Sequence, residues 1–194
     1  MRIFSSLNRI TFWIFHKIFE DRRVLRSTIF PHFAQSTKYK NILFVGCKWY
    51  TFRYNIIFRN KNYWTLEKNP QRRKYGAENH ICASMEEIHQ HFKENSLDLI
   101  VCNGVFGWGL DSTSSVEKAF SNSYESLRVG GILIIGWNDI PKRRPFPLDE
   151  CLALRSFNSY IFPPLDESVY KTNTQNKHQY NFYIKTKHAQ DLMK

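Results

Sequence analysis

Two residues 21 positions apart, Gly46 and Glu67, carry the clearest chemical signal in this sequence of 194 residues. Gly46 ends an apolar run at a point where the chain must turn sharply, and a glycine there lets a backbone approach a ligand closely. Glu67 ends the next apolar run, at the offset where nucleotide-binding α/β proteins place an acidic residue on the hydroxyls of a ribose. The pair therefore predicts a site for an adenosine-type ligand. Lys48, Trp49 and Tyr50 occupy the turn where further glycines would cradle a pyrophosphate, which disfavours a dinucleotide.

Other candidate site residues follow apolar runs in the same way. Ligands of an open parallel sheet bind outside the carboxyl ends of its strands, so the residues directly after each run are candidates. They are Gly46, Cys47, Lys48 and Trp49 after the first run, Ala83 and Ser84 after the third, Asn103 and Gly104 after the fourth, and Asn138 and Asp139 after the fifth. We expect these side chains to share one edge of the sheet.

The acceptor side of such a site has fewer candidates. Asp139 has the chemistry to orient or deprotonate a hydroxyl or an amine, although a residue just before Pro141 also suits a turn. Asn103 offers an amide, and His178 lies in a polar stretch where a solvated side chain is the alternative to a catalytic one. Trp108 lies in a loop with three glycines, which suits a ligand approached by backbone and walled by aromatic rings.

The elements that must position these residues follow from the apolar pattern. Five apolar runs, at 41–46, 62–67, 80–84, 97–104 and 132–139, predict buried strands. The segments between them have helical spacing, including one at Phe52, Ile56 and Ile57 and one capped at Ser112 or Ser114. This alternation predicts a doubly wound α/β fold. Two further runs, at 157–163 and 180–187, add strands that are antiparallel at least in part, so we expect a mostly parallel sheet of seven strands.

The N-terminal part of the chain differs in charge from the rest. Residues 1–60 hold eleven Lys and Arg against two acidic residues, Glu20 and Asp21, within a formal net charge of +11. Residues 8–29 have helical spacing that Pro31 is expected to break, so we predict a basic helical extension over 1–37 and one domain over 38–194. The helix either packs on the sheet or lies on an anionic membrane or over a substrate, which leaves peripheral membrane contact through residues 1–30 open.

The cysteines indicate a reducing compartment. Four cysteines, Cys47, Cys82, Cys102 and Cys151, lie far apart without a CxxC pair, which favours free thiols over a metal site. No run approaches the roughly 20 apolar residues that span a bilayer, and no signal-peptide pattern is present. We therefore expect a cytoplasmic protein with no bound metal, either free or peripheral to a membrane.

The order of the elements and the residues at the strand ends resemble class I S-adenosylmethionine-dependent methyltransferases. The segment ILFVGC resembles their first motif and YWTLEKNP their second, HICASMEEI lies where the adenine-contacting loop would be, and LDLIVCNGVFGWG resembles the fourth motif. The most specific match is AFSNSYESLRVGGILIIGWND, a helix followed by a Gly-Gly turn into an apolar strand. The resemblance covers about residues 38–186 and implies the Rossmann-like methyltransferase fold.

The resemblance also implies a cofactor and roles for residues. The cofactor is S-adenosylmethionine, held by Gly46, Cys47, Lys48, Trp49, Glu67, Ala83, Ser84, Asn103 and Gly104. Asp139, Asn103 and His178 are the implied catalytic candidates. The sequence departs from the family where Lys48, Trp49 and Tyr50 replace glycines and where no aspartate follows the third strand.

Several functions remain compatible with the sequence. We expect O-methylation of a small molecule or a carbohydrate, because loops rich in aromatic and amide side chains suit polar acceptors and no nucleic-acid-binding module is present. An RNA-modifying methyltransferase is the alternative that the basic N-terminal third supports, although no RNA-binding motif does. A non-catalytic binding module that keeps the fold is another. A nicotinamide-dependent dehydrogenase would need phosphate-cradling glycines that this sequence lacks.

Overall fold

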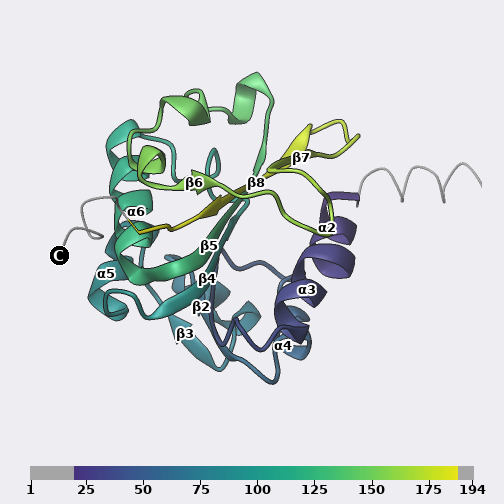
Figure 1. Ribbon diagram of the computed structural model, residues 1–194, viewed down its shortest axis with the longest axis vertical. Helices are drawn as coiled ribbons and strands as arrows, with labels where there is room; N and C mark the ends of the chain where they lie inside the picture. Colours follow the sequence, from purple (N-terminus) through teal and green to yellow (C-terminus); the bar gives the residue numbers. More distant parts are fainter. Residues whose placement is uncertain (1–19, 188–194) are drawn as a thin grey trace, which may run out of the picture.

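The computed structural model describes residues 20–187, which form one sheet with helices on both faces (Figure 1). The strands are β1 Asn41–Val45, β2 Asn62–Leu66, β3 Asn79–Ile81, β4 Leu97–Asn103, β5 Leu127–Asn138, β6 Asn158–Ser159, β7 Val169–Lys171 and β8 His178–Ile184. The order across the sheet is β3-β2-β1-β4-β5-β8-β6, and β7 pairs with β8. The first five strands are parallel, and β8 is antiparallel to β5. The expected Rossmann-like methyltransferase fold is confirmed.

Helical elements cover the two faces of the sheet. They are α2 Glu20–Val24, the π-helical turn η1 Leu25–Ile29, α3 Phe30–Gln35, α4 Tyr54–Ile57, α5 Ile88–His91 and α6 Thr113–Ser126, with 3₁₀ turns η2 Pro70–Tyr75, η3 Met85–Glu87, η4 Pro141–Arg143, η5 Leu148–Glu150 and η6 Ala153–Ser156. Figure 1 shows α2, α3 and α4 on one side of the sheet and α5 and α6 on the other. Each side has its own buried cluster, because β1, β4 and β5 carry apolar side chains on both faces.

The N-terminal helix continues through Pro31, so the expectation that this proline ends it was wrong. Elements α2, η1 and α3 run without a break from residue 20 to residue 35. Pro31 lies in the first turn of α3, directly after the π-helical turn, in which the Phe30 N–H bonds to the Leu25 carbonyl. That wider turn shifts the hydrogen-bond register just before the proline, whose missing N–H and bulky ring an ordinary α-helix does not accommodate.

The described part of this helix belongs to the domain core. Leu25, Ile29, Phe30 and Phe33 are fully buried. The Phe30 ring lies edge-on to Tyr54 and to Phe58, with centroids 4.8 and 4.9 Å away. Of the two alternatives for this helix, residues 20–35 therefore follow the first and pack on the sheet. The predicted boundary at 37/38 stays a prediction, and residues 1–19, which carry most of the expected extension, lie outside the described residues. None of the helices within 20–187 is long and apolar enough to cross a membrane.

Two local expectations were wrong. The polar stretch between the last two predicted strands contains β7, whose residues Val169–Lys171 pair with Asn181–Gln179 of β8. In α4 the buried face consists of Tyr54, with Phe58 just after the helix, whereas Phe52 and Ile56 are 56% and 65% exposed. The positions of the apolar residues alone do not identify the buried face of α4, because Tyr54 is buried there and Ile56 is exposed.

The buried helix gives a test of the core. Replacing Phe30 by Ala should lower the free energy of unfolding by about 3–5 kcal/mol, since it removes a fully buried ring from an aromatic cluster. Phe52→Ala, at an exposed position, should change it by less than about 0.5 kcal/mol. Urea unfolding monitored by circular dichroism measures both. Equal effects of the two substitutions would show that the helix does not contribute to the core.

Candidate functional site

A cavity of about 120 Å³, called the main cavity because most of the predicted site residues line it, lies at the carboxyl ends of β1, β2 and β4, where the strand order reverses between β1 and β4. Its walls come from the ends of these strands, the loop after β3 and the loop after β4. They are Val45, Gly46, Cys47, Lys48, Tyr50, Leu66, Glu67, Lys68, Arg72, Ala83, Ser84, Met85, Glu86, Asn103, Gly104, Val105, Trp108, Gly109 and Leu110. The topological switch point is where open α/β sheets bind their ligands.

Gly46 makes the turn out of β1 in a conformation that favours glycine. Its φ is +90°, and a Cβ atom at this position would lie 2.7 Å from the Val105 side chain. Its N–H donates to the Leu66 carbonyl at 2.8 Å, which continues the pairing of β1 with β2 to the cavity edge. A side chain here would therefore both strain the backbone and push the loop after β4 away.

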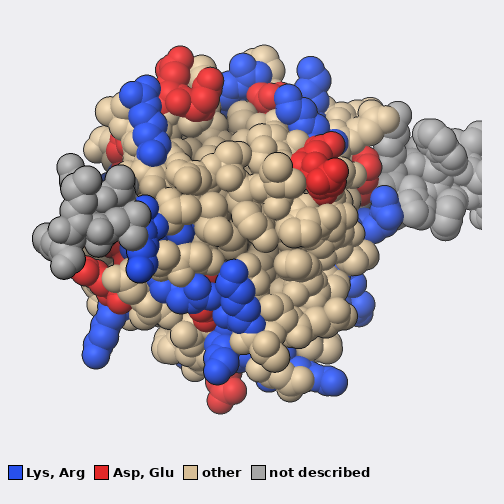
Figure 2. Space-filling model, viewed as in Figure 1, with Lys and Arg blue, Asp and Glu red and all other residues tan. Residues whose placement is uncertain are grey.

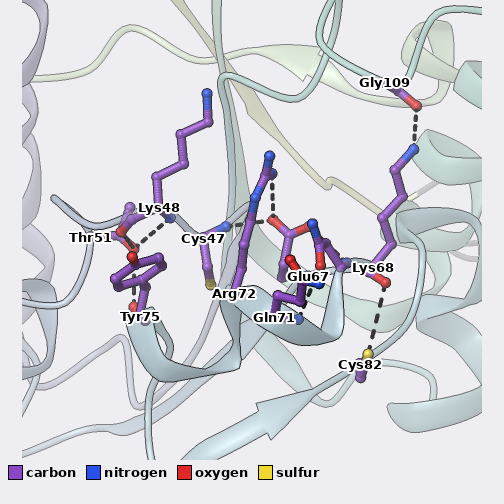
Figure 3. A network of polar contacts seen from close by, with 11 residues as sticks. Cys47, Lys48, Thr51, Glu67, Lys68, Gln71, Arg72, Tyr75, Cys82 and Gly109 are labelled. Carbon is purple, nitrogen blue, oxygen red and sulfur yellow. Dashed lines mark hydrogen bonds and ion pairs between the residues drawn. The ribbon is translucent and has the colours of Figure 1, made fainter.

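The Glu67 carboxylate ties the ends of β1 and β2 together (Figure 3). Oε2 accepts a hydrogen bond from the Cys47 N–H, and Oε1 accepts one from the Asn69 N–H, both at 2.9 Å. The Arg72 guanidinium lies 3.5 Å from Oε2. Glu67 is only 6% exposed, so these contacts compensate a buried negative charge. A carboxylate has about four acceptor positions, which leaves Oε1 able to accept one more donor from the cavity.

Cys47 presents its backbone to the site and keeps its thiol buried. The side chain is fully buried, and burial raises the pKa of the thiol to about 12, with the neighbouring Glu67 charge contributing in the same direction. The thiol is therefore protonated and unreactive at neutral pH. The following turn is closed by Thr51, whose hydroxyl accepts from the Lys48 N–H at 3.1 Å.

Eight of the nine residues predicted to hold the cofactor line this cavity: Gly46, Cys47, Lys48, Glu67, Ala83, Ser84, Asn103 and Gly104. The ninth, Trp49, does not. Its ring is 68% exposed and lies outside the wall, edge-on to Tyr50. The residue that follows it, Tyr50, lines the cavity instead, because the turn after Lys48 directs neighbouring side chains to different sides.

His178 lies behind the cavity wall, not in a polar loop. It is the first residue of β8 and pairs in register with Asn138. Its Nδ1 lies 2.6 Å from the Asn138 Oδ1 and its Nε2 lies 3.2 Å from the Asn103 Oδ1. Burial, with a contribution from the Arg22 charge, lowers the pKa of His178 to about 4. The imidazole is therefore neutral at pH 7, donates through one nitrogen and accepts through the other, so one of the two amides must present its NH₂ to the ring.

This network makes His178 a positioning residue for Asn103. Asn103 lines the cavity, whereas His178 does not. The amide of Asn103 also packs directly over Gly136, where a Cβ atom would lie 2.0 Å from its Oδ1. The Asn103 side chain is thus held from two sides, with one edge of its amide left for a ligand.

Asp139, the expected acceptor-side base, is not brought to this cavity. Its carboxylate lies 2.6 Å from the Arg144 guanidinium. It lines a second cavity of about 250 Å³, together with Trp137, Gln179 and Asn181. The chain turns at Ile140 towards η4, and this turn directs Asp139 away from Asn103.

Sequence reasoning missed three residues of the site. Arg72 contacts Glu67 from five positions downstream, and the basic run in which it lies was its only signal. Lys68 donates to the Gly109 carbonyl at 3.0 Å and so joins the ends of β2 and the loop after β4. Arg143 lies on the Trp108 ring, 35 positions away in sequence, and no local pattern predicts that contact.

The buried histidine predicts a specific pH dependence of stability. Since the pKa of His178 falls from 6.5 to about 4 on folding, the unfolded chain binds its proton first as the pH drops through this window. Folding then loses up to about 1.4 kcal/mol per pH unit between these values, and no such loss occurs above 6.5. Urea unfolding at pH 4.5, 5.5 and 7.5 should show a steeper loss for the wild type than for His178→Asn. Parallel curves for the two proteins would contradict a neutral, buried His178.

Comparisons with known proteins agree with this geometry. The family model described as a methyltransferase domain matches residues 58–135. No curated protein sequence matches the chain. Among solved structures, the N-methyltransferase NodS from Bradyrhizobium japonicum superposes with a TM-score of 0.64 at 14% identity, covering 87% of this chain and 98% of that one.

Two other solved structures share the fold over most of both chains. A TehB-like SAM-dependent methyltransferase from Corynebacterium glutamicum has a TM-score of 0.59 at 14% identity and covers 94% of this chain and 98% of its own. An rRNA methylase from Streptococcus thermophilus has a TM-score of 0.56 at 14% identity, with 82% and 95% covered. The methyltransferase-domain match and the shared fold are consistent with a class I S-adenosylmethionine-dependent methyltransferase.

Proposed function

We propose that this methyltransferase binds S-adenosylmethionine in the main cavity and transfers the methyl group to a hydroxyl of a small molecule or a carbohydrate. The observation that carries the cofactor assignment is the buried Glu67 carboxylate, which faces the cavity with acceptor capacity left after its two backbone hydrogen bonds. A ribose diol offers the matching donors. When bound, the cofactor supplies a methyl group on a positively charged sulfur.

The residues of this chain would divide the remaining work. Gly46 lets the β1 turn approach the methionine end of the cofactor, and Lys48 narrows the cavity beside it. Ala83 and Ser84 lie where the adenine would contact the loop after β3. Asn103 would orient the acceptor through its amide, since His178 holds that amide in place. Orientation of donor and acceptor is the main requirement of such a transfer.

The proposed catalytic roles differ among the three candidates. Asn103 lies at the cavity wall and would contact the acceptor, whereas His178 would act through Asn103. An amide does not take up a proton, so a base is needed wherever the hydroxyl must lose one. Asp139 would serve as that base only after its ion pair with Arg144 opens.

The fold does not decide the acceptor, because the structural neighbours act on different ones. NodS is an N-methyltransferase, the protein from Streptococcus thermophilus is an rRNA methylase, and one from Burkholderia thailandensis is a 1,6-didemethyltoxoflavin N1-methyltransferase. In this chain β4 is followed by Asn103-Gly104-Val105-Phe106, without the Asn-Pro-Pro-Tyr pattern of enzymes that methylate amino groups of bases.

RNA is the second candidate acceptor, and exposed aromatic rings next to cations favour it. Trp49 is 68% exposed, and the Arg22 guanidinium lies 6.0 Å from its ring centroid. Figure 2 shows one face of the molecule, where Lys and Arg side chains lie at the upper rim and in the lower part, interspersed with acidic groups, around an uncharged middle. A continuous basic track for a nucleic-acid backbone is not visible on that face, so we favour the small acceptor.

We propose the cytoplasm as the location. All four cysteines are unpaired, and Cys47, Cys102 and Cys151 are buried, which suits a reducing compartment. Membrane contact through residues 1–30 stays a prediction, since the described part of that segment buries its apolar face in the core.

Methyl transfer from S-[methyl-³H]adenosylmethionine tests the acceptor class. We expect label in pooled hydroxylated small molecules and carbohydrates and none in total RNA. Asn103→Ala should lower the turnover number at least tenfold without changing the affinity for S-adenosylhomocysteine more than twofold, because the lost contact serves the acceptor.

If label appears only in RNA, and the affinity of the protein for RNA falls steeply as the salt concentration rises, the acceptor is RNA and not a small molecule. An Asn103→Ala protein that turns over normally would remove Asn103 from the acceptor side.

A further inference from the structure

Two cations converge on one aromatic ring at the mouth of the cofactor cavity. The Arg143 guanidinium carbon lies 3.3 Å from the centroid of the Trp108 ring, and the Lys48 Nζ lies 5.0 Å from the same centroid. Trp108 is 44% exposed, and both Trp108 and Lys48 line the cavity. The two charges come from different loops, after β5 and after β1, and both lie beside the space that the cofactor would share with an acceptor.

The position of Arg143 is fixed by close backbone packing. Gly107 has a φ of +77°, and a Cβ atom there would lie 1.9 Å from the Arg143 carbonyl oxygen. The Arg143 N–H also donates to the Ile140 carbonyl at 2.8 Å. The guanidinium itself donates from one terminal nitrogen to the Gly107 carbonyl at 3.5 Å. The loop after β4 therefore contacts both the backbone and the guanidinium of Arg143 beside the Trp108 ring.

Within residues 20–187 neither Arg143 nor Lys48 forms an ion pair with a carboxylate, and the ion pairs there join Glu67, Asp98 and Asp139 to other arginines. Partial burial lowers the pKa of Lys48, the nearby charges of Arg72, Arg22 and Arg143 lower it further, and the Glu67 charge opposes them as the smallest of these effects. The cavity mouth is thus a region of repelling positive charges. S-adenosylmethionine carries a sulfonium, an ammonium and one carboxylate, a net positive charge, so its binding would leave the excess positive charge at the mouth without an anion.

We propose that the methyl acceptor carries a carboxylate or phosphate group, which binds between Arg143 and Lys48 against the Trp108 ring. This inference rests on the proposed function, since it places the acceptor beside the cofactor. Arg143 would give the group paired hydrogen bonds in a fixed geometry, and Lys48 a second positive charge. The anion would hold one end of the acceptor while a hydroxyl elsewhere on it reaches Asn103.

The same geometry favours a small anion over a nucleic-acid strand. A strand needs several phosphate contacts along a track and aromatic rings spaced for successive bases. Here Arg143 and Lys48 lie against a single ring, Arg143 with one nitrogen on the Gly107 carbonyl, whereas the neighbouring cations Arg72 and Lys68 contact Glu67 and the Gly109 carbonyl. One anionic group satisfies this arrangement.

Isothermal titration of the full chain, saturated with S-adenosylhomocysteine, tests the proposal. The probes are inorganic pyrophosphate, malonate and a 12-nucleotide oligouridylate, and the variants are Arg143→Gln and the matched control Lys142→Gln. Lys142 lies in the same turn η4, is exposed and carries the same charge. Binding of pyrophosphate or malonate should weaken at least tenfold in Arg143→Gln and less than twofold in Lys142→Gln. The affinity for S-adenosylhomocysteine should change less than twofold in both.

The outcomes separate the proposals. Preference for pyrophosphate would identify the group as phosphate, and preference for malonate as carboxylate. No binding of either small anion, or equal weakening by both variants, would overturn the inference. Tight oligouridylate binding that both variants weaken equally would replace it with a nucleic-acid surface. Failure to bind S-adenosylhomocysteine would instead defeat the proposed function, and titrating the anions into the cofactor-free protein would still measure the Arg143 site.

Discussion

The buried Glu67 carboxylate is the contact on which the rest of the site depends. It accepts hydrogen bonds from the Cys47 and Asn69 amides and so joins the turn after β1 to the turn after β2. A carboxylate buried to this degree must be compensated, and backbone N–H groups do so without closing the cavity. The clamp shapes the wall where Gly46 turns, and the carboxylate that lines the cavity keeps acceptor capacity beyond these contacts. The same side chain thus builds the site and offers the group that would recognise a ribose.

The two halves of the site are organised differently. The half that we propose for the cofactor is built from backbone turns at the ends of parallel strands, with Glu67 and Gly46 as its fixed points. The half that we propose for the acceptor is built from side chains that elements distant in sequence bring together: Asn103 against His178, and Trp108 against Arg143. This division explains how one fold serves many acceptors, because the loops after β4 and β5 can change without disturbing the β1–β2 turn.

The sequence predicted the cofactor half better than the acceptor half. Gly46 and Glu67 are found where their spacing placed them, since the carboxyl ends of neighbouring parallel strands must share one edge. Trp49 was misplaced because its orientation depends on a turn that Thr51 closes. His178 was expected in a polar loop, as a catalytic or a solvated residue, because the short strand β7 and the contact with Asn138 are tertiary features that leave no local pattern. The continuation of the first helix through Pro31 depends on a π-helical turn, which spacing rules for ordinary helices do not anticipate.

The most direct test of this account is a thermal melt of the wild type and of Glu67→Gln, each with and without S-adenosylhomocysteine. At about 100 times its dissociation constant, the ligand should stabilise the wild type by about 2.7 kcal/mol, a rise of roughly 5–10 °C for a domain of this size. Glu67→Gln should melt lower without ligand, because an amide nitrogen cannot accept the Cys47 or Asn69 hydrogen bond, and the same ligand concentration should give little or no rise. A variant that melts lower but keeps the full rise would show that Glu67 is only a structural clamp. A wild type that shows no rise would contradict the cofactor site itself.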